Sequence, residues 1–163
     1  MSQILKMKIV ALISMLLFYS NIKAQTPAST IPQFQFFKFD NTAFTDKNIP
    51  GNKKVFFCFF DITCEHCQHV IENVNLHYAE FSKTEMYLIS LDSKDGINKF
   101  LNKNGSNLLN KRNVTLLLDL KNQFISKFQP RKYPSLFLYS KTKKLLLYSD
   151  DETKFLSFLS HLK

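Results

Sequence analysis

The chain has 163 residues and a formal net charge of +9, because 22 lysine and arginine residues outnumber 13 acidic ones. A basic balance of this size is typical of proteins that bind nucleic acid or a membrane surface. However, the lysines are scattered among acidic and polar residues, and only Arg112 and Arg131 are arginine, the residue that reads phosphates and bases best. We therefore expect no nucleic-acid partner.

Residues 1–24 predict a cleaved signal peptide. Lys6 and Lys8 precede a mostly apolar run from Ile9 to Tyr19, and Ala24 is a small residue suited to the cleavage position. The run is shorter than the roughly 20 residues that cross a bilayer; an uncleaved anchor or a buried helix is the alternative. We expect an exported mature chain, periplasmic or extracellular, without a stable membrane span.

Residues 25–32 predict a flexible segment, and residues 33–163 predict one domain. An alternating aromatic stretch predicts a strand at Gln33–Asp40, followed by a long turn-rich segment. The continuous apolar run Val55–Phe60 predicts a central strand that is buried on both faces. From Glu65 the apolar residues recur at helical spacing, to about Ser82.

The second half of the domain continues this alternation. Strands are predicted at Met86–Leu91, Val114–Leu118, Ser135–Ser140 and Lys144–Ser149, and the last two indicate a hairpin. Helices are predicted at Lys94–Lys103, over "DLKNQFISKF" (119–128) and at Asp151–Lys163; the last has Phe155, Leu156, Leu159 and Leu162 inward and Asp150 or Asp151 near its N-cap. This order predicts an α/β fold with a mixed sheet and helices on both faces.

The motif Cys64-Glu65-His66-Cys67 lies where the central strand gives way to a helix. Backbone N–H groups and the helix dipole favour a thiolate at a helix N-terminus. We expect Cys64 to be exposed in the first turn, with Cys67 one turn deeper and within reach of its sulfur. Such a pair can attack a substrate disulfide and then resolve the mixed disulfide. A protonated His66 would favour the thiolate, whereas Glu65 would oppose it.

A metal site is the main alternative for this motif, because Cys64, His66, Cys67 and His69 fall within six residues. On a helix, His66 and His69 point away from the face of the cysteines, and a closed zinc site would need a second pair of ligands. Cuprous copper needs only two or three soft ligands, so a copper-binding carrier stays open. A static disulfide and a catalytically idle interaction module stay open too.

Two stretches, "VFFCFFDITCEHC" (55–67) and "RKYPSLFLY" (131–139), together resemble the thioredoxin superfamily, especially the exported thiol–disulfide oxidoreductases of the TlpA/ResA type. The resemblance covers nearly all of the mature chain and implies a thioredoxin-like fold with an N-terminal strand extension. It implies that Cys64 is the nucleophile and Cys67 the resolving thiol of a redox-active disulfide. It also implies that Pro134 is a cis-proline facing them and that the backbone of Tyr133 pairs with a substrate chain.

Three departures from the family pattern concern the cysteine environment. Thr63 replaces the aromatic residue that precedes the first cysteine in many thioredoxins, and Glu65-His66 replaces the common Gly-Pro. Cys58 stands where thioredoxins proper keep a buried acid, which leaves Asp61 as the nearest acidic candidate to take a proton from Cys67. A histidine before the second cysteine is reminiscent of strongly oxidising members, so reductase and oxidase directions both stay open.

The resemblance also implies the partners. They are cysteine-containing exported proteins and a thiol–disulfide redox partner. We also expect a monomer and no external cofactor. Peroxide reduction is not expected, because peroxiredoxins place a threonine two residues from their cysteine, whereas Thr63 adjoins Cys64.

Overall fold

The computed structural model describes Gln3 and residues 25–162. The predicted signal peptide, residues 1–24, lies outside the described residues except for Gln3. Within the described part of the chain, no helix is long and apolar enough to cross a membrane.

The described residues form one seven-stranded sheet in the order β2-β1-β5-β4-β3-β6-β7. The strands are β1 (Gln35–Phe37), β2 (Ala43–Thr45), β3 (Lys54–Phe59), β4 (Thr84–Ser90), β5 (Val114–Leu118), β6 (Ser135–Tyr139) and β7 (Leu145–Ser149). β4 pairs in parallel with both β3 and β5, whereas the other neighbours are antiparallel. The sheet is therefore mixed, as predicted, and β6 and β7 form the predicted hairpin.

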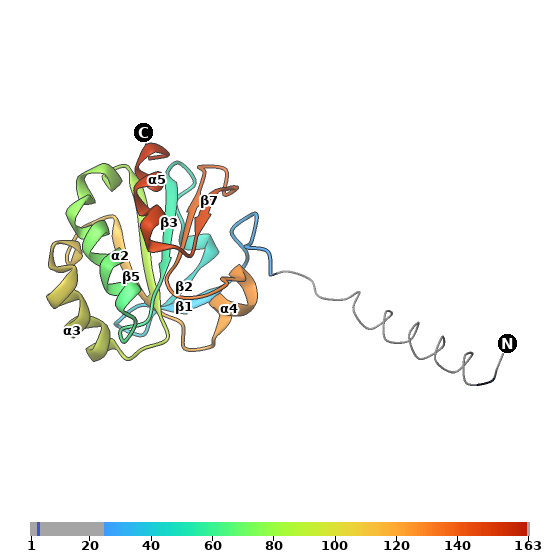
Figure 1. Cartoon of the computed structure of the whole chain (residues 1–163). Helices are drawn as coiled ribbons and strands as arrows, with labels where there is room; N and C mark the ends of the chain where they lie inside the picture. Colours follow the sequence, from blue (N-terminus) through green and yellow to red (C-terminus); the bar gives the residue numbers. More distant parts are fainter. Residues whose placement is uncertain (1–2, 4–24, 163) are drawn as a thin grey trace.

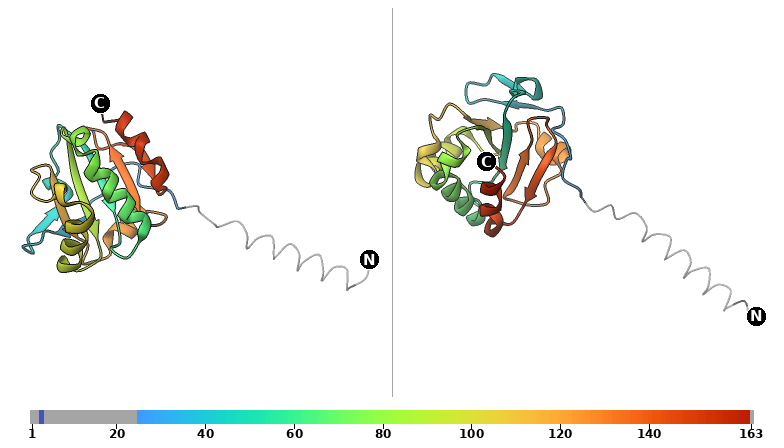
Figure 2. Two further views of the ribbon diagram at one scale, coloured as in Figure 1. Left: turned by 60° about the vertical axis from the view of Figure 1, so that its left-hand side comes forward. Right: turned by 90° about the horizontal axis from the view of Figure 1, so that it is seen from above.

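Helices cover both faces of this sheet (Figure 1 and Figure 2). They are α2 (Glu65–Leu76), α3 (Lys94–Asn104), α4 (Gln123–Phe128) and α5 (Phe155–Ser160), with short 3-10 turns that include η3 (Tyr78–Phe81) and η5 (Glu152–Lys154). α2, α3 and α5 share one hydrophobic core with one face of the sheet, and α4 shares a second core with the other face. The predicted layers are confirmed.

The central strand β3 supplies both cores. Phe56 and Cys58 belong to the core beneath α2, whereas Val55 and Phe57 belong to the core beneath α4. All four side chains are buried. This double burial confirms the prediction drawn from the continuous apolar run.

Two predictions about smaller elements were wrong. The turn-rich segment contains β2, which pairs with β1 through a turn at Asn41 (φ 64°) and buries Phe44 against Tyr87, with ring centroids 5.1 Å apart. A single aromatic residue among polar neighbours gives no period from which a strand could be predicted. In the last helix, Leu156 is 61% exposed and Phe158 is buried in its place. Residues three or four apart share a helix face, and it is Phe158, not Leu156, that has this spacing from Phe155 and Leu162.

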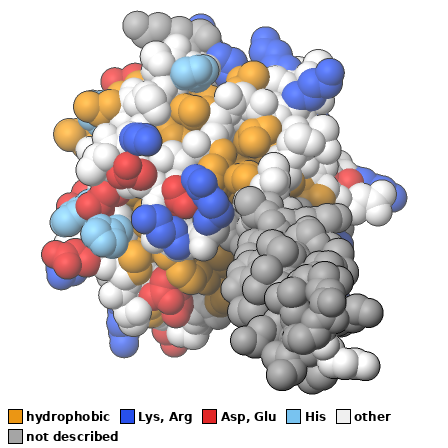
Figure 3. All heavy atoms as spheres, turned by 45° about the vertical axis from the view of Figure 1, so that its right-hand side comes forward, with side chains coloured by type: hydrophobic (Ala, Val, Ile, Leu, Met, Phe, Trp, Pro, Cys, Tyr) orange, Lys and Arg blue, Asp and Glu red, His pale blue; other side chains and the backbone are white. Residues whose placement is uncertain are grey.

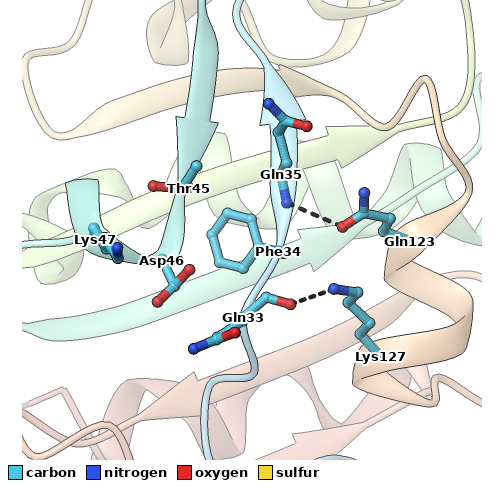
Figure 4. Close-up of a pocket in the computed structure, with 8 residues that line it drawn as sticks. All are labelled: Gln33, Phe34, Gln35, Thr45, Asp46, Lys47, Gln123 and Lys127. Carbon is cyan, nitrogen blue, oxygen red and sulfur yellow. Dashed lines mark hydrogen bonds between the residues drawn. The ribbon is translucent and has the colours of Figure 1, made fainter.

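Side-chain hydrogen bonds tie α4 to the N-terminal strands. The backbone N–H of Gln35 donates to Oε1 of Gln123 at 3.0 Å, and Nζ of Lys127 donates to the carbonyl of Gln33 at 2.7 Å (Figure 4). The same residues line a hollow of about 340 Å³ that no cysteine lines. Its polar groups hold the N-terminal extension against the domain.

The different burial of Phe158 and Leu156 can be tested directly. Phe158→Ala should lower the free energy of unfolding by about 3 kcal/mol or more, because it opens a cavity in the core. Leu156→Ala, two residues away on the exposed side, should change it by less than about 0.5 kcal/mol. Urea unfolding followed by circular dichroism measures both values. Equal losses in the two variants would contradict the burial assigned to these two side chains.

Candidate active site

The cysteine motif follows the carboxyl end of β3, where the chain turns into α2. The N–H of Phe60 donates to the carbonyl of Ile89 at 3.0 Å, so the chain stays beside β4 for one more residue. Oδ1 of Asp61 then accepts hydrogen bonds from the N–H and hydroxyl of Thr63, at 2.7 and 2.6 Å. The carbonyl of Asp61 accepts from the N–H of Cys64 at 3.3 Å. This side-chain-closed turn delivers Cys64 to the start of the helix.

A carboxylate from the neighbouring strand fixes the same turn. Oδ2 of Asp92, just beyond β4, accepts from the N–H of Ile62 at 3.0 Å and from the hydroxyl of Ser90 at 2.7 Å. The N–H of Asp92 donates back to the Ser90 hydroxyl at 3.1 Å. The hydrogen bond to Ile62 thus connects the segments that follow β3 and β4, two adjacent parallel strands.

Cys64 is the N-cap of α2, with φ −85° and ψ 116°, and its Sγ accepts a hydrogen bond from the N–H of Cys67 at 3.3 Å. Both thiols are unbridged; Cys64 is half-buried and Cys67 is buried. Burial is the main reason why the pKa of Cys67 is raised well above its usual value. Its contacts with Cys64 and Cys58 raise that pKa further, whereas the backbone of Asp61 acts in the opposite direction. Cys67 is therefore a buried, protonated thiol, whereas Cys64 is the more accessible of the two.

Cys58 faces the same core as Cys67 and lies opposite Leu88 of β4 and Leu136 of β6. Burial raises the pKa of Cys58 too, so this thiol cannot act as a base toward Cys67 at neutral pH. The carboxylate of Asp61, the acidic candidate from the sequence, is engaged by Thr63. It is the backbone of Asp61 that favours the Cys67 thiolate.

The loop before β6 lies against the cysteine turn. The Tyr133–Pro134 peptide bond is cis, and the ring of Tyr133 packs on Phe59 with centroids 4.6 Å apart. Burial raises the pKa of Tyr133 to about 12, with further contributions from the charges of Asp61 and Asp92 and from Cys67. Tyr133 also packs against the core that contains Cys67, as Cys64 does.

A hollow of about 190 Å³ opens beside this loop. It is lined by His66, Lys132, Tyr133, Pro134, Asp150, Asp151, Glu152 and Thr153. Its walls thus come from the first turn of α2, the loop before β6, and η5 with the residues before it. The structure brings all the predicted site residues to this end of the sheet: Cys64, Cys67, His66, Tyr133 and Pro134.

Glu152 of η5 contacts both histidines of the first half of α2. Nδ1 of His66 lies 2.9 Å from Oε1 of Glu152, and Nδ1 of His69 lies 3.1 Å from Oε2. The pKa of Glu152 is lowered, chiefly by the hydrogen bond with His66; burial opposes this effect, and the bond with His69 adds to it. Figure 3 shows histidine and acidic side chains side by side on one face of the molecule.

The four candidate metal ligands of the sequence do not converge. Among residues 25–162, no group of three or more His, Cys, Asp or Glu side chains is placed to hold a metal ion. The sequence did not reveal two residues of the site, Glu152 and Asp92. Glu152 lies in η5 and Asp92 follows β4, so both are distant from the cysteine motif in the sequence, and neither belongs to a motif of its own. The only signals in the sequence are that Asp92 directly follows a predicted strand and that Glu152 lies near the predicted start of the last helix.

Comparisons with known proteins agree with this geometry. The chain matches the model of the AhpC/TSA family over residues 27–147 and belongs to that family. The family includes both thiol–disulfide oxidoreductases and peroxiredoxins, so the chain belongs to a class of redox proteins. None of the curated proteins compared with it matches its sequence significantly.

Solved structures place the fold. The thioredoxin domain of a thiol-disulfide oxidoreductase from Bacteroides vulgatus is 15% identical, with a TM-score of 0.66 over 86% of this chain and 100% of that one. A secreted disulfide oxidoreductase from Mycobacterium tuberculosis, homologous to DsbE of E. coli, is 14% identical, with a TM-score of 0.63 over 79% and 96%. Peroxidoxin BcpB from M. tuberculosis is also 14% identical, with a TM-score of 0.67 over 85% and 97%. The fold is thioredoxin-like.

The burial difference between the thiols should appear in their alkylation. In the reduced protein at neutral pH, iodoacetamide should label Cys64, with Cys67 and Cys58 at least about 100-fold slower, because only the thiolate reacts and burial disfavours it. Mass spectrometry of timed digests measures the three rates. In concentrated urea all three cysteines should react alike, and fast labelling of Cys67 in the folded protein would contradict the assignment.

The Asp92 contact should be measurable in stability. Asp92→Ala leaves the N–H of Ile62 without its acceptor and should cost about 1–2 kcal/mol of unfolding free energy. Asp92→Asn keeps an oxygen acceptor and should cost less. Urea unfolding gives the free energies, and amide hydrogen exchange at Ile62 should accelerate in the alanine variant. Unchanged exchange at Ile62 would show that this contact does not hold the turn.

Proposed function

We propose that this protein exchanges disulfides with cysteine-containing exported proteins through Cys64 and Cys67. The observation that carries this proposal is that Cys64, a half-buried residue at a helix N-cap, lies next to the buried Cys67. The backbone N–H of Cys67 donates a hydrogen bond to Cys64 Sγ, with nitrogen and sulfur 3.3 Å apart. A negative sulfur at this position gains from the backbone N–H groups of the helix start. Membership of a redox family agrees with that chemistry.

The exchange balances with two electrons. The Cys64 thiolate attacks one sulfur of a substrate disulfide, a mixed disulfide forms, and the other substrate sulfur leaves as a thiolate. Cys67 then loses its proton and attacks Cys64 Sγ, which releases the second substrate thiolate and leaves a Cys64–Cys67 disulfide. Two electrons have passed to the substrate. A substrate dithiol drives the same steps in reverse, and His66 tunes the thiolate of Cys64.

The loop around Tyr133 and Pro134 is the proposed binding surface for the substrate chain. The backbone of Tyr133 makes no hydrogen bond within the described part of the chain, so an extended peptide could pair with it as an added strand. The hollow lined by His66 and Pro134 would accept the side chain next to the substrate cysteine. No external cofactor is required.

Export is part of the proposal. It is supported by the charged start, short apolar run and small residue of residues 1–24, which have the order of a signal peptide. The solved structure of a secreted disulfide oxidoreductase has the same fold. An exported chain would meet oxidising conditions in which disulfide exchange is needed.

The reduction potential of the Cys64–Cys67 pair tests the proposal. The mature domain is equilibrated with glutathione or dithiothreitol, and the fraction oxidised is read by alkylation and mass. We expect a reversible two-electron couple. A value near about −120 mV would define a disulfide donor, and one near about −270 mV a reductase. Cys67→Ser should trap mixed disulfides with substrate proteins, whereas Cys64→Ser should trap none.

Absence of a reversible couple would overturn the exchange function. Tight, stoichiometric cuprous binding that Cys64→Ser abolishes would then make the protein a copper carrier. An unreactive Cys64 without copper binding would indicate an interaction module. Rapid consumption of hydrogen peroxide by the reduced protein would instead place it with the peroxiredoxins of the same family.

A further inference from the structure

A tyrosine of β7 holds the proline loop, by which we mean residues 131–135, from α4 to the first residue of β6. Tyr148 lies opposite Phe137 of β6, and the two rings pack edge to face with centroids 4.7 Å apart. The N–H of Arg131 donates to Tyr148 Oη at 3.0 Å, and Oγ of Ser135 also lies 3.0 Å from this oxygen. One hydroxyl therefore contacts the proline loop at both of its ends.

The direction of each hydrogen bond follows from counting hydrogens. Oγ of Ser135 donates to the carbonyl of Lys132 at 2.6 Å, and a serine hydroxyl has only one hydrogen to give. Tyr148 is therefore the donor to Ser135, and its oxygen accepts from Arg131. The result is a chain of hydrogen bonds that runs from the Arg131 N–H through two hydroxyls to the Lys132 carbonyl. It joins neighbouring residues of the loop and so restricts their relative movement.

The surroundings of the chain shield it from water. Ser135 is fully buried. On the solvent side, the Arg131 guanidinium lies over the Tyr148 ring, with Cζ 5.0 Å from the centroid, and Asp150 binds its Nε and Nη2 at 2.9 and 3.0 Å. Hydrogen bonds in such an environment are stronger than exposed ones and cost more when broken. Because Asp150 directly follows β7, the end of this strand holds the loop twice.

We propose that Tyr148 is a positioning residue for disulfide exchange: its hydroxyl fixes the proline loop in the shape that presents the backbone of Tyr133 to an extended substrate chain. This inference rests on the proposed function. Tyr133 lies between the two residues that the serine hydroxyl joins, Lys132 and Ser135. A loop that is ordered before binding loses less entropy when a substrate chain pairs with it as an added strand. Tyr148 acts through the loop.

The hydroxyl can be removed without disturbing the strand that carries it. β7 is held by its pairing with β6 and by the packing of the Tyr148 ring on Phe137. Tyr148→Phe keeps this packing and the surface on which Arg131 lies, and it removes only the hydrogen bonds to the loop. The variant therefore separates the contribution of the loop contacts from that of the hairpin.

The experiment compares two disulfides that share one reacting bond. One is a peptide of about ten residues, long enough to pair as an added strand, whose central cysteine forms a mixed disulfide with 2-mercaptoethanol. The other is N-acetylcysteine amide in the same mixed disulfide, without a flanking chain. Either one oxidises the reduced mature protein to the Cys64–Cys67 disulfide and is split into two thiols, so two electrons pass to the probe. Alkylation and mass spectrometry of quenched samples give a second-order rate constant for each probe.

Tyr148→Phe should lower the rate constant for the peptide by about threefold to tenfold, the range that one neutral hydrogen bond is worth, and leave that for the small disulfide within about twofold. Ser135→Ala interrupts the same chain and should act in the same direction. The double variant should therefore lose less than the product of the two single losses. Amide hydrogen exchange at Arg131 should be faster in Tyr148→Phe than in the wild type.

Tyr139→Phe is the matched control. Tyr139 lies in the neighbouring strand β6, and its hydroxyl donates to the carbonyl of Ala28 at 3.0 Å. The same chemical change thus removes a hydrogen bond to the N-terminal segment instead of one to the loop. Both rate constants should stay at their wild-type values. Urea unfolding of each variant checks that it is folded.

Three results would overturn the inference. The first is a peptide rate constant that Tyr148→Phe leaves within about twofold of wild type, because the lost hydrogen bonds should exceed that. The second is an equal loss with both probes, because the hydroxyl would then not act on the pairing of a chain. The third is a wild type that reacts no faster with the peptide than with the small disulfide. If the wild type reacts with neither probe, it is the proposed exchange function that fails, so the two failures are distinguished.

Discussion

The double burial of β3 is the constraint on which the rest of the structure depends. Because β3 pairs with β4 on one side and with β6 on the other, and fills a core on each face, it can shift neither in depth nor in register. Its carboxyl end therefore emerges at one fixed place. The turn that follows inherits that position, and with it the start of α2 and the sulfur of Cys64.

This arrangement gives the three cysteines different environments simply through their positions on β3 and α2. Cys58 lies inside the strand and packs as an apolar side chain, and Cys67 lies on the buried side of the helix. Only Cys64, at the cap between them, is open to a partner. Burial raises the pKa of the two inner thiols, so depth alone makes the three sulfurs unequal in reactivity. In the proposed exchange, the outer sulfur therefore attacks first.

The sequence predicted elements that have a local periodic pattern better than contacts between distant segments. The strand Val55–Phe60 and the helix after Glu65 were predicted because each has its own period, and the cysteine motif lies between them. Their meeting with the loop around Pro134 rested on resemblance to a family. By contrast, β2 has too few apolar residues to show a period. Leu156 was predicted to face inward, but it lies one residue after Phe155 and so on another side of the helix, where it is exposed.

The residues that the sequence did not reveal share a physical property: each acts on the site from another element. Asp92 reaches the turn from the end of β4, and Glu152 reaches α2 from η5, 83 residues after His69. A carboxylate in a loop has no period, and its partners are chosen by topology. Periodicity can place the elements of such a site, but it cannot show which loop side chains complete it.

The last segment of the chain therefore has two roles that depend on each other. Phe155 and Phe158 anchor α5 in the core shared with α2, which fixes η5 against the active-site helix. That anchoring keeps Glu152 within hydrogen-bond distance of both histidines. An anion held this way costs little conformational entropy to place, because the hydrophobic contacts have already ordered its backbone. The packing of the C-terminal segment thereby places the carboxylate that binds both histidines of α2.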